Sequence, residues 1–495
     1  MTSQTLTTWD ARADALSIDG RAFVDGRRTG AASKKTRIVT SPIDGRELIA
    51  LSACGAEDVE VAVAAARRAF GAWSRSGPES RKHVLLAWAA LLEVHAEELA
   101  LLESLDSGKP ILQTTTVDVP GAISTLRWYA EAVDKQQGEM PVVPPGATAL
   151  VTREALGVVA AIVPWNFPLE IAIWKLAPAL ASGNTVVLKP AEQTSLSILR
   201  AAELAAEAGM PEGVLNIVTG SGREIGAALA LHMDVDALTF TGSTAVSRTL
   251  LEASGRSNLK RLSLEAGGKS SNLVFADAAD LALAAEKAAF GAFYNQGQVC
   301  SSNSRILVQR SVHDEFKSLL EEAAQAYLPA DPLAGLGGNG ALISRGHTDD
   351  VEGWIHRGRS EGTVLFGGGR LDIRGSDAYL EPTLLGGLDA GHEVHREEIF
   401  GPVAVLQPFD TEEEAVAMAN DTDYGLAASL WTSDLSRAHR VAGELVAGTV
   451  SVNTVDALGN STPFGGFKQS GFGRDLSLQA FDNYTAAKTT WIQFG

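Results

Sequence analysis

The spacing of apolar positions divides the chain into a helical first part and a longer part in which strands and helices alternate. Residues 57–70 and 78–107 carry apolar side chains at helical spacing, and the second segment ends at the stop signal Ser-Gly-Lys-Pro. From about residue 151, short apolar runs such as GVVAAIVP and NTVVLKP alternate with helix-like stretches. This alternation predicts a doubly wound, mainly parallel α/β sheet.

A second α/β unit is predicted to begin near Leu262. The runs RLSLEAGG and SNLVFAD are typical of strands, and an Ala-rich helix and the strand SRILVQR follow them. The proline-rich segment 140–154 interrupts the first unit, which predicts an extended excursion with the character of an edge hairpin.

Composition and charge limit the class of protein. The chain of 495 residues is long enough for roughly three domains. Its net charge of −19 disfavours a nucleic acid or an anionic membrane surface as partner.

The two cysteines, Cys54 and Cys300, cannot build a disulfide framework, and no signal peptide is seen, so we expect a cytoplasmic setting. The apolar run 155–169 holds two prolines and is short for a membrane span, which predicts a buried core segment.

Three residues are candidates for catalysis, and each has a structural alternative. Cys300 in FYNQGQVCSSNSR is either a nucleophile or a small buried residue, which is the commoner fate of a free cysteine. Glu265, at a predicted strand end before two glycines, is either a desolvated general base or an ion-paired structural residue. Asn166, between two prolines in PWNFP, either donates to an oxyanion or forms a turn.

Further candidates lie at predicted strand ends, where ligands bind in open α/β sheets. The segment TGSGREIG, residues 219–226, fits GxGxxxG and not the dinucleotide fingerprint GxGxxG, so it indicates a tight turn. Gly242 and Ser243 precede a predicted helix and either hold a phosphate or simply cap the helix. Lys189 and Glu192 either bind ribose hydroxyls or form a solvated pair.

The segment GHEVHREE, residues 391–398, is the one stretch that imitates a metal motif. Its histidines are three positions apart, and not the four that place two ligands on one helix face, so we expect a surface loop. No other group of His and Cys has ligand spacing, and no metal site is predicted.

Seven segments occur in order between residues 164 and 475: PWNFP, LKPAE, FTGS, LEAGGKS, FYNQGQVCSS, EEIFGPV and PFGGFKQSGFGRD. Together they resemble the NAD(P)-dependent aldehyde dehydrogenase superfamily, over essentially the whole chain. DVPGAISTLRWYAEAVDK and KTTWIQF add a finer similarity to the γ-glutamylaminobutyraldehyde, 4-guanidinobutyraldehyde and indole-acetaldehyde dehydrogenase group.

The resemblance implies two Rossmann-like domains and a small β oligomerisation hairpin, in a homodimer or homotetramer. We expect a NAD-binding domain of residues 1–131 and 152–261 and a catalytic domain of residues 262–473. The oligomerisation segment would then consist of residues 132–151 and 474–495.

The resemblance also implies roles for individual residues. Cys300 would be the nucleophile, Asn166 an oxyanion donor together with the Cys300 backbone N–H, and Glu265 the base for the hydrolytic water. Cofactor contacts are expected from Val163, Trp165, Lys189, Glu192, Gly222, Gly226, Phe240, Gly242, Ser243, Gly267, Glu398 and Phe400. NAD is expected and NADP is less favoured, because an acid at the ribose 2′-hydroxyl repels a 2′-phosphate.

The substrate tunnel is expected to be lined by Asp118, Gly121, Phe167, Glu170, Trp174, Asp456, Leu458 and Phe464. Glu170 departs from the family pattern, where this position is commonly apolar. It either faces the tunnel and receives a cationic ω-amino or guanidino group, or it points away into a salt bridge. Gly121 would leave room for a long or bulky substrate.

The expected reaction is oxidation of an ω-amino, guanidino or γ-glutamylamino aldehyde to the acid through a thioester. Indole-acetaldehyde or a broad range of aldehydes is the alternative substrate. A non-redox thiol hydrolase or an inactive scaffold is the alternative class. The partner is expected to be the small-molecule aldehyde, with neither nucleic acid nor membrane.

Overall fold

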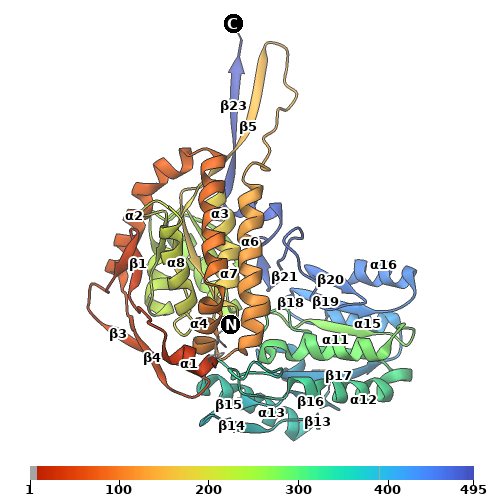
Figure 1. Ribbon diagram of the computed structural model, residues 1–495. Coiled ribbons are helices and arrows are strands. Elements are labelled where there is room, and N and C mark those ends of the chain that lie inside the picture. Colours follow the sequence, from red (N-terminus) through yellow and green to blue (C-terminus); the bar gives the residue numbers. More distant parts are fainter. Residues whose placement is uncertain (1–7, 390, 495) are drawn as a thin grey trace, which may run out of the picture.

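The computed structural model describes residues 8–389 and 391–494 and contains two large sheets (Figure 1). The first sheet has the strand order β2-β1-β8-β7-β6-β9-β10-β22. These strands are β1 (Ala22–Val24), β2 (Arg27–Thr29), β6 (Val158–Ile162), β7 (Thr185–Lys189), β8 (Leu215–Ile217), β9 (Ala237–Thr241), β10 (Arg261–Glu265) and β22 (Gly471–Phe472). The strands from β8 to β10 are parallel. The order reverses between β6 and β9, and ligands bind at the carboxyl ends of such a switch point.

Helices cover both faces of the first sheet, and its central strands β6, β7 and β9 are buried at every position. Val159 and Ala161 of β6 join one core, while Val158 and Ala160 join the other, as the two-residue period of a strand requires. The first core is closed mainly by α3 (Pro78–Val94), α4 (Ala96–Ser107), α6 (Val119–Ala132), α7 (Pro168–Ala181) and α8 (Leu196–Glu207). The second core is closed by α2 (Ala56–Arg75), α9 (Ala227–Leu231) and α10 (Thr244–Arg256).

The predicted helix over residues 78–107 is two helices. His95 leaves the helical conformation with φ −101° and ψ 17°, and it ends α3 and begins α4. Its Nδ1 lies 2.7 Å from Oε2 of Glu98 in the first turn of α4. The break lies in the backbone conformation of His95, which hydrophobic spacing alone does not reveal.

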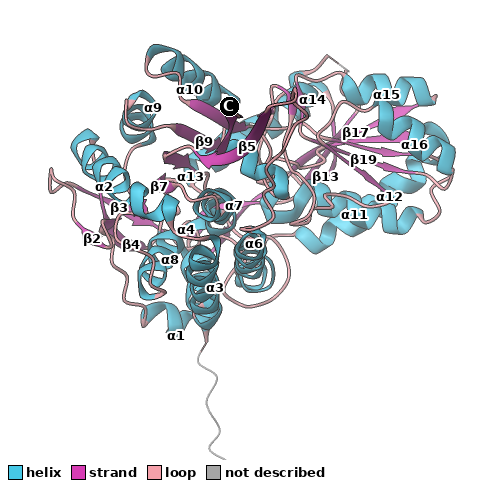
Figure 2. Ribbon diagram, turned by 90° about the horizontal axis from the view of Figure 1, so that it is seen from above, coloured by secondary structure: helices cyan, strands magenta, loops and turns pink. Residues whose placement is uncertain are grey.

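The second sheet has the order β13-β16-β17-β12-β11-β19-β20 and is parallel except at β13. Its strands are β11 (Ser271–Val274), β12 (Arg305–Gln309), β13 (Thr363–Phe366), β16 (Thr383–Gly386), β17 (Val403–Phe409), β19 (Ala427–Trp431) and β20 (Thr449–Val452). Figure 2 shows α11 (Leu281–Phe293) and α12 (His313–Ala324) on one side of the sheet, with α15 (Glu412–Asn420) and α16 (Leu435–Glu444) on the other. The helix α13 (Arg345–Glu361) packs at the β13 edge.

The second sheet begins later in the chain than predicted. Strand β10 pairs with β9 along its whole length, from Arg261 opposite Ala237 to Glu265 opposite Thr241, so it belongs to the first sheet. The expected start at Leu262 is therefore wrong for the sheet, which begins with β11 at Ser271. Pairing with β9 decides the membership of β10, and the hydrophobic pattern of a buried strand is the same in either sheet.

A long two-stranded ribbon projects from the body of the molecule (Figure 1). It consists of β5 (Ala147–Ala155) and β23 (Thr485–Gln493), which pair antiparallel over nine residue pairs. The predicted excursion at residues 140–154 thus contains a strand, but its partner comes from the end of the chain. No helix in the described ranges is long and apolar enough to cross a membrane.

The remaining elements are short. They are α1 (Trp9–Asp14), α5 (Ile111–Gln113), α14 (Glu393–Arg396), β3 (Thr36–Thr40), β4 (Glu47–Ser52), β14 (Arg370–Ile373), β15 (Ser376–Leu380), β18 (Tyr424–Gly425) and β21 (Phe467–Lys468). The β3–β4 and β14–β15 pairs are antiparallel hairpins on the surface.

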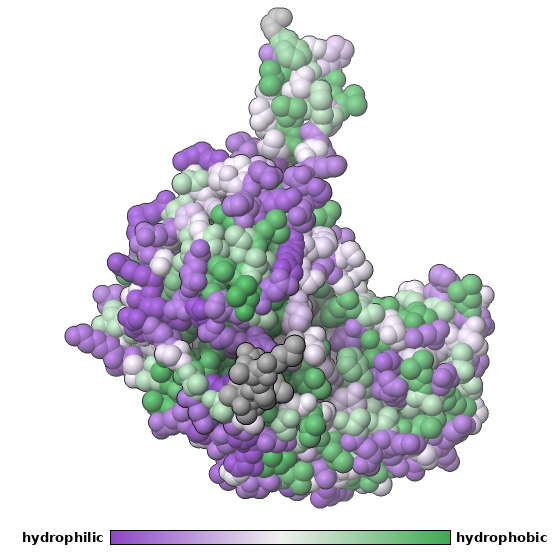
Figure 3. Space-filling view, in the orientation of Figure 1, coloured by the Kyte–Doolittle hydropathy of each residue, from purple (hydrophilic) through white to green (hydrophobic). Residues whose placement is uncertain are grey.

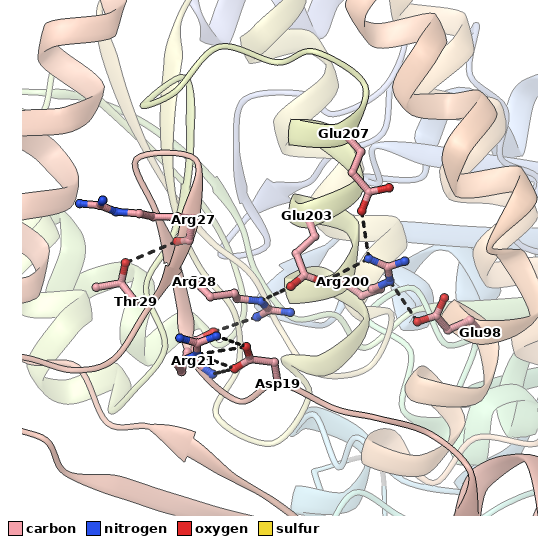
Figure 4. A network of polar contacts seen from close by, with 9 residues as sticks. All are labelled: Asp19, Arg21, Arg27, Arg28, Thr29, Glu98, Arg200, Glu203 and Glu207. Carbon is pink, nitrogen blue, oxygen red and sulfur yellow. Dashed lines mark hydrogen bonds and ion pairs between the residues drawn. The ribbon is translucent and has the colours of Figure 1, made fainter.

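A polar network fixes the outer hairpin β1–β2 to the helices beside it (Figure 4). Arg28 pairs with Glu203 of α8 at 2.6 Å, and Arg200 of α8 reaches Glu98 of α4 at 3.0 Å. Arg200 also pairs with Glu203 and Glu207. Exposed single pairs contribute about 0–1 kcal/mol, but Arg28 is only 10% exposed, and linked pairs hold several elements in one arrangement.

Candidate active site

Two cavities meet at Cys300. The first has a volume of about 270 Å³ and is lined by Val117, Phe167, Glu170, Ile171, Trp174, Thr241, Glu265, Phe290, Tyr294, Val299, Cys300, Ser301, Asp456, Leu458, Phe464 and Asp475. The second has about 220 Å³ and is lined by Pro164, Trp165, Asn166, Thr241, Gly242, Ser243, Ala266, Gly267, Cys300, His347, Glu398 and Phe400. The two walls share Cys300 and Thr241, so groups in either cavity can approach this thiol.

A strained loop holds Cys300 in place. Asn295 and Gln296, just before it, have φ angles of 50° and 57°, in the left-handed region that such residues rarely adopt. The Asn295 side chain donates to the backbone carbonyls of Asn166 and Gln298, at 3.1 and 3.2 Å. The Gln298 side chain accepts from the backbone N–H of Ile343 at 3.0 Å. Buried amide contacts within the loop and to two other segments, at Asn166 and Ile343, therefore offset the backbone strain and fix the loop.

Asn166 is tied to the same loop and keeps one donor free. Its Nδ2 donates to the Gln298 carbonyl at 2.9 Å, and its own carbonyl accepts from Lys109 Nζ at 3.0 Å. An amide group carries two N–H donors, so the second remains for a ligand in the cavity that Asn166 lines. The structure thus places the predicted oxyanion donor on the wall shared with Cys300.

Glu265 lies at the end of β10 and lines the first cavity with Cys300. Both carboxylate oxygens are buried without a hydrogen-bond partner among the described residues. Burial and the nearby Asp475 raise the pKa of Glu265 well above its usual range, although Lys175 opposes this. A carboxylate that resists ionisation is a stronger base when it does ionise, which suits proton abstraction from water.

Lys175 and Asp475 form a fully buried pair beside Glu265, with Nζ and Oδ2 2.5 Å apart. Sequence reasoning did not single out either residue. A signal was present, because Lys175 interrupts the otherwise apolar run IAIWKLAPAL, and a lysine at such a position needs a partner.

The surroundings of Cys300 oppose formation of the thiolate. Burial raises the pKa of the thiol, and the acids Asp456, Glu398 and Glu265 raise it further. The thiolate is the nucleophilic form, so the site requires an added positive charge before Cys300 can react efficiently.

The second cavity opens onto the start of a helix. Ser243 caps α10, and its Oγ accepts from the Val246 N–H at 3.3 Å. The backbone N–H groups here and the helix dipole suit a phosphate group. Glu398 accepts from the Gly268 N–H at 3.0 Å, and burial raises its pKa to about 7. A Cβ at Gly267 would collide with the Glu398 carboxylate, so a larger residue there would displace this carboxylate.

His347 of α13 also lines this cavity and was missed from the sequence. Its Nε2 lies 2.8 Å from the Phe400 carbonyl, and Trp165 meets the rings of His347 and Phe400 edge-on. Burial lowers the pKa of His347, so the neutral ring donates to the carbonyl. Nothing in the sequence marks this histidine, because α13 reaches the site only through the packing of the second sheet.

Lys189, Glu192 and Gly222 come together at the carboxyl ends of β7 and β8. Glu192 Oε1 accepts from the Gly222 N–H at 2.8 Å, and Lys189 Nζ donates to the Pro190 carbonyl at 2.8 Å. Burial, together with the charge of Arg37, lowers the pKa of Lys189 to about 8. Arg37 itself forms an ion pair with Glu192, and this contact between segments far apart in the chain could not be predicted from local spacing.

Six predicted cofactor residues do not line the second cavity. Three of them, Lys189, Glu192 and Gly222, lie together at the ends of β7 and β8, as described above. Val163 and Phe240 are buried in the two cores of the first sheet, and Gly226 packs near Ile162. They support the cavity wall from behind.

Six of the eight predicted tunnel residues line the first cavity. They are Phe167, Glu170, Trp174, Asp456, Leu458 and Phe464. Burial raises the pKa of Glu170 to about 8, and the charge of Asp118 adds to this while Lys109 opposes it.

Asp118 and Gly121 lie behind the cavity wall. Asp118 is fully buried and pairs with Lys109 at 2.7 Å, because a carboxylate that deep requires a countercharge. A Cβ at Gly121 would lie 2.6 Å from Glu170 Oε1. The space beside Gly121 therefore holds the Glu170 carboxylate and is not left for substrate.

The segment 391–398 is not the predicted surface loop. His392 caps the short helix α14 through its Nδ1, 3.2 Å from the Val394 N–H, and His395 is buried. Within residues 8–389 and 391–494, no cluster of His, Cys, Asp and Glu could hold a metal ion.

Comparison with known proteins gives consistent similarities. Residues 29–490 match the model of the aldehyde dehydrogenase family. The NADP/NAD-dependent aldehyde dehydrogenase PuuC of Escherichia coli is 48% identical over 98% of each chain. The aminoacetaldehyde dehydrogenase of Pseudomonas aeruginosa is 46% identical over 97% of each chain. A mutant of the P. syringae indole-3-acetaldehyde dehydrogenase AldA, solved with NAD+ and IAA, matches at a TM-score of 0.97 and 50% identity, over 99% of this chain and 100% of that one.

Proposed function

The chain belongs to the aldehyde dehydrogenase family and oxidises aldehydes, and we propose that it uses NAD to convert a cationic aldehyde into the carboxylic acid. The observation that carries the proposal is the position of Cys300 between two cavities of different character. One has a helix start, the Glu398 carboxylate and glycines, and the other has aromatic walls and four acids, which are Glu170, Glu265, Asp456 and Asp475.

The second cavity fits NAD. The start of α10 at Ser243 suits the pyrophosphate, and the Glu398 carboxylate suits the hydroxyls of the nicotinamide ribose. Outside this cavity, at the carboxyl ends of β7 and β8, Lys189 and Glu192 suit the adenosine ribose, and Gly222 leaves open space where a Cβ would approach both side chains. When bound, NAD supplies a cationic ring and the hydride acceptor.

Cys300 then attacks the aldehyde. A thiolate Sγ bonds to the carbonyl carbon, and the carbonyl oxygen becomes an oxyanion. The free N–H of Asn166 and the Cys300 backbone N–H hold this oxyanion. One such donor is worth about 3–4 kcal/mol in a well-studied enzyme. Departure of hydride from the same carbon leaves a thioester on Cys300.

Glu265 completes the reaction. Its carboxylate takes a proton from water, the resulting hydroxide adds to the thioester, and the C–S bond breaks to release the acid. The orphaned oxygens of Glu265, on the same cavity wall as Cys300, support this role.

The first cavity favours an ω-amino or guanidino aldehyde as substrate. Glu170 and Asp456 are acids on a wall otherwise formed largely by aromatic and apolar side chains, such as Trp174 and Phe464. A buried acid is costly without a partner, and a cationic substrate group provides one. Indole-acetaldehyde is the second candidate, because aromatic walls also accept an indole ring and AldA is similar over the whole chain.

The test is NADH formation from a panel of aldehydes. We expect higher kcat/KM for aminoaldehydes and 4-guanidinobutyraldehyde than for alkanals of equal length. Cys300→Ala should abolish NADH formation while NAD still binds, as measured by calorimetry. Absence of NADH with every aldehyde would contradict the proposal, and activity in Cys300→Ala would contradict the role of the thiol.

We further propose a homodimer or homotetramer in the cytoplasm. The ribbon exposes Trp491 and Ile492 of β23 and Leu150 of β5. Figure 3 shows hydrophobic atoms, in green, on the surface of the projection. Exposed apolar side chains on an uncovered ribbon support a protein interface.

Both cysteines are free thiols, which suits a reducing compartment. The division into NAD-binding, catalytic and oligomerisation segments belongs to the same proposal, with β10 (Arg261–Glu265) moved to the NAD-binding part because it pairs with β9.

A further inference from the structure

An arginine from a distant segment reaches the adenosine end of the proposed cofactor site. Arg37 lies on β3, in the hairpin β3–β4, and its Nη1 forms an ion pair with Oε2 of Glu192. The other Glu192 oxygen accepts from the Gly222 N–H at 2.8 Å. The Arg37 side chain remains 51% exposed, so the guanidinium is partnered by Glu192 and still open to a ligand.

This pair changes the electrostatics at the ribose. A free Glu192 carboxylate would repel a 2′-phosphate, which is why the sequence favoured NAD over NADP. In the structure, Arg37 balances the charge of Glu192, and Lys189 adds a second basic group at the same place. The net charge of Arg37, Glu192 and Lys189 together is positive when Lys189 is protonated and neutral when it is not.

We propose that Arg37 is a binding residue for the 2′-phosphate of NADP, through which the enzyme accepts NADP as well as NAD. The proposal rests on the proposed function, because it assumes that Lys189 and Glu192 hold the adenosine ribose. A guanidinium presents a planar pair of N–H donors, and phosphate oxygens accept them in the same two-point geometry that a carboxylate does. Arg37 therefore exchanges Glu192 for the phosphate when NADP binds, and it returns to Glu192 when NAD binds.

Calorimetric titration of the whole enzyme with two fragments tests this inference. AMP and adenosine 2′,5′-bisphosphate differ only in the 2′-phosphate. In Arg37→Gln we expect the affinity for the bisphosphate to fall about tenfold while that for AMP stays within about twofold, since one charge-assisted two-point contact is lost. Arg256→Gln, which removes an exposed arginine near the end of α10, should change neither affinity.

Glu192→Gln provides the opposite perturbation. It releases Arg37 and removes a negative charge, so the affinity for the bisphosphate should rise relative to that for AMP. Thermal melting of each variant confirms that it is folded.

The outcomes separate the two proposals. An unchanged ratio of the two affinities in Arg37→Gln, with AMP still bound, overturns the role of Arg37 and leaves the proposed function standing. Failure of folded wild-type enzyme to bind AMP, NAD and the bisphosphate overturns both.

Discussion

At the scale of single residues, two glutamates line one cavity wall and have different neighbours. Glu265 lies beside the buried pair Lys175–Asp475, and its oxygens have no partner in the part of the chain that the structure describes. Glu170 lies near Asp118 and Lys109 and faces the cavity from α7. We assign proton transfer to the first and recognition of a cationic substrate to the second.

Glu265→Gln should separate oxidation from hydrolysis. The amide keeps the shape of the side chain but cannot take a proton, and general-base catalysis contributes about 10²–10⁴-fold. We expect a rapid burst of about one NADH per subunit, followed by turnover slowed by about that factor, as seen by stopped-flow absorbance. Intact-protein mass spectrometry should detect the acyl group on Cys300.

Glu154→Gln, on the exposed face of β5, is the matched control and should behave as wild type. Rapid steady turnover in Glu265→Gln without an acyl adduct would contradict the role of Glu265 as the base.

Glu170 should give the folded state a characteristic dependence on pH. Its pKa is raised to about 8, whereas an unfolded glutamate has a pKa of about 4.3. Between these values the folded protein binds more protons than the unfolded chain, so the Glu170 contribution lowers the free energy of unfolding as pH rises. In Glu170→Gln, the fall in Tm from about pH 5 to about pH 8 should therefore be smaller than in wild type, as measured by calorimetry. An equal fall in Tm in the two proteins would contradict a raised pKa of Glu170.

The sequence identified the residues whose chemistry is local. Cys300, Glu265 and Asn166 stand next to glycines, prolines and strand ends that the chain itself displays, and the structure places all three around one pair of cavities. It did not reveal His347 or Arg37, since both reach the site from elements whose position depends on tertiary packing. Their roles could not follow from local spacing.

At the scale of elements, the packing of α6 against α7 shapes the substrate cavity. Gly121 on α6 faces Glu170 on α7, and the absence of a side chain there admits the carboxylate. Glycine within a helix costs about 1 kcal/mol relative to alanine, so its presence between Val119 and Ala132 indicates a steric requirement.

Gly121→Ala should disturb recognition of cationic substrates more than catalysis. The new Cβ would lie 2.6 Å from Glu170 Oε1 and would displace the carboxylate. We expect KM for 4-guanidinobutyraldehyde to rise about fivefold or more relative to a neutral alkanal, which corresponds to about 1 kcal/mol. Steady-state kinetics with both aldehydes provide the measurement.

Gly255→Ala on α10 is the control, because a Cβ there meets nothing within 4 Å. Equal changes in KM for the two aldehydes would mean that Gly121 does not act through Glu170.

The hydrophobic pattern predicted the elements better than it predicted their pairing. The alternation after residue 151 gave strands at β6, β7, β8 and β9, and the structure confirms them. The pattern misassigned β10 to the second unit, because which strand it pairs with is decided by the whole sheet. It also joined α3 and α4, since the break at His95 lies in its backbone conformation, which apolar spacing does not show.

At the scale of the whole molecule, the ribbon β5–β23 is the part least supported by the rest of the chain. A two-stranded ribbon is at best marginally stable in water, and this one leaves Trp491 55% exposed. Coverage by another subunit would supply the missing support.

Trp491→Asp should therefore weaken assembly. The aspartate carboxylate would be buried in the interface without a partner. A buried unpaired charge weakens the free energy of association by about 2–5 kcal/mol. We expect light scattering after size-exclusion chromatography to give a smaller mass at low micromolar concentration.

Lys488→Gln, on the same strand and 64% exposed, should leave the mass unchanged. A monomeric wild-type protein, or an unchanged mass in Trp491→Asp, would contradict the proposed interface.

The sharing of just Cys300 and Thr241 between the two cavities makes the enzyme modular. Substitutions on the α6–α7 wall can retune which aldehyde is taken without reshaping the nucleotide half, and substitutions around Glu192 can retune the redox partner without reshaping the tunnel. The free-energy effects of mutations in the two halves should then be additive, as they usually are for distant sites. Such an architecture lets one reactive thiol serve many aldehydes as a lineage diversifies, and it lets a protein engineer alter the two specificities in separate libraries.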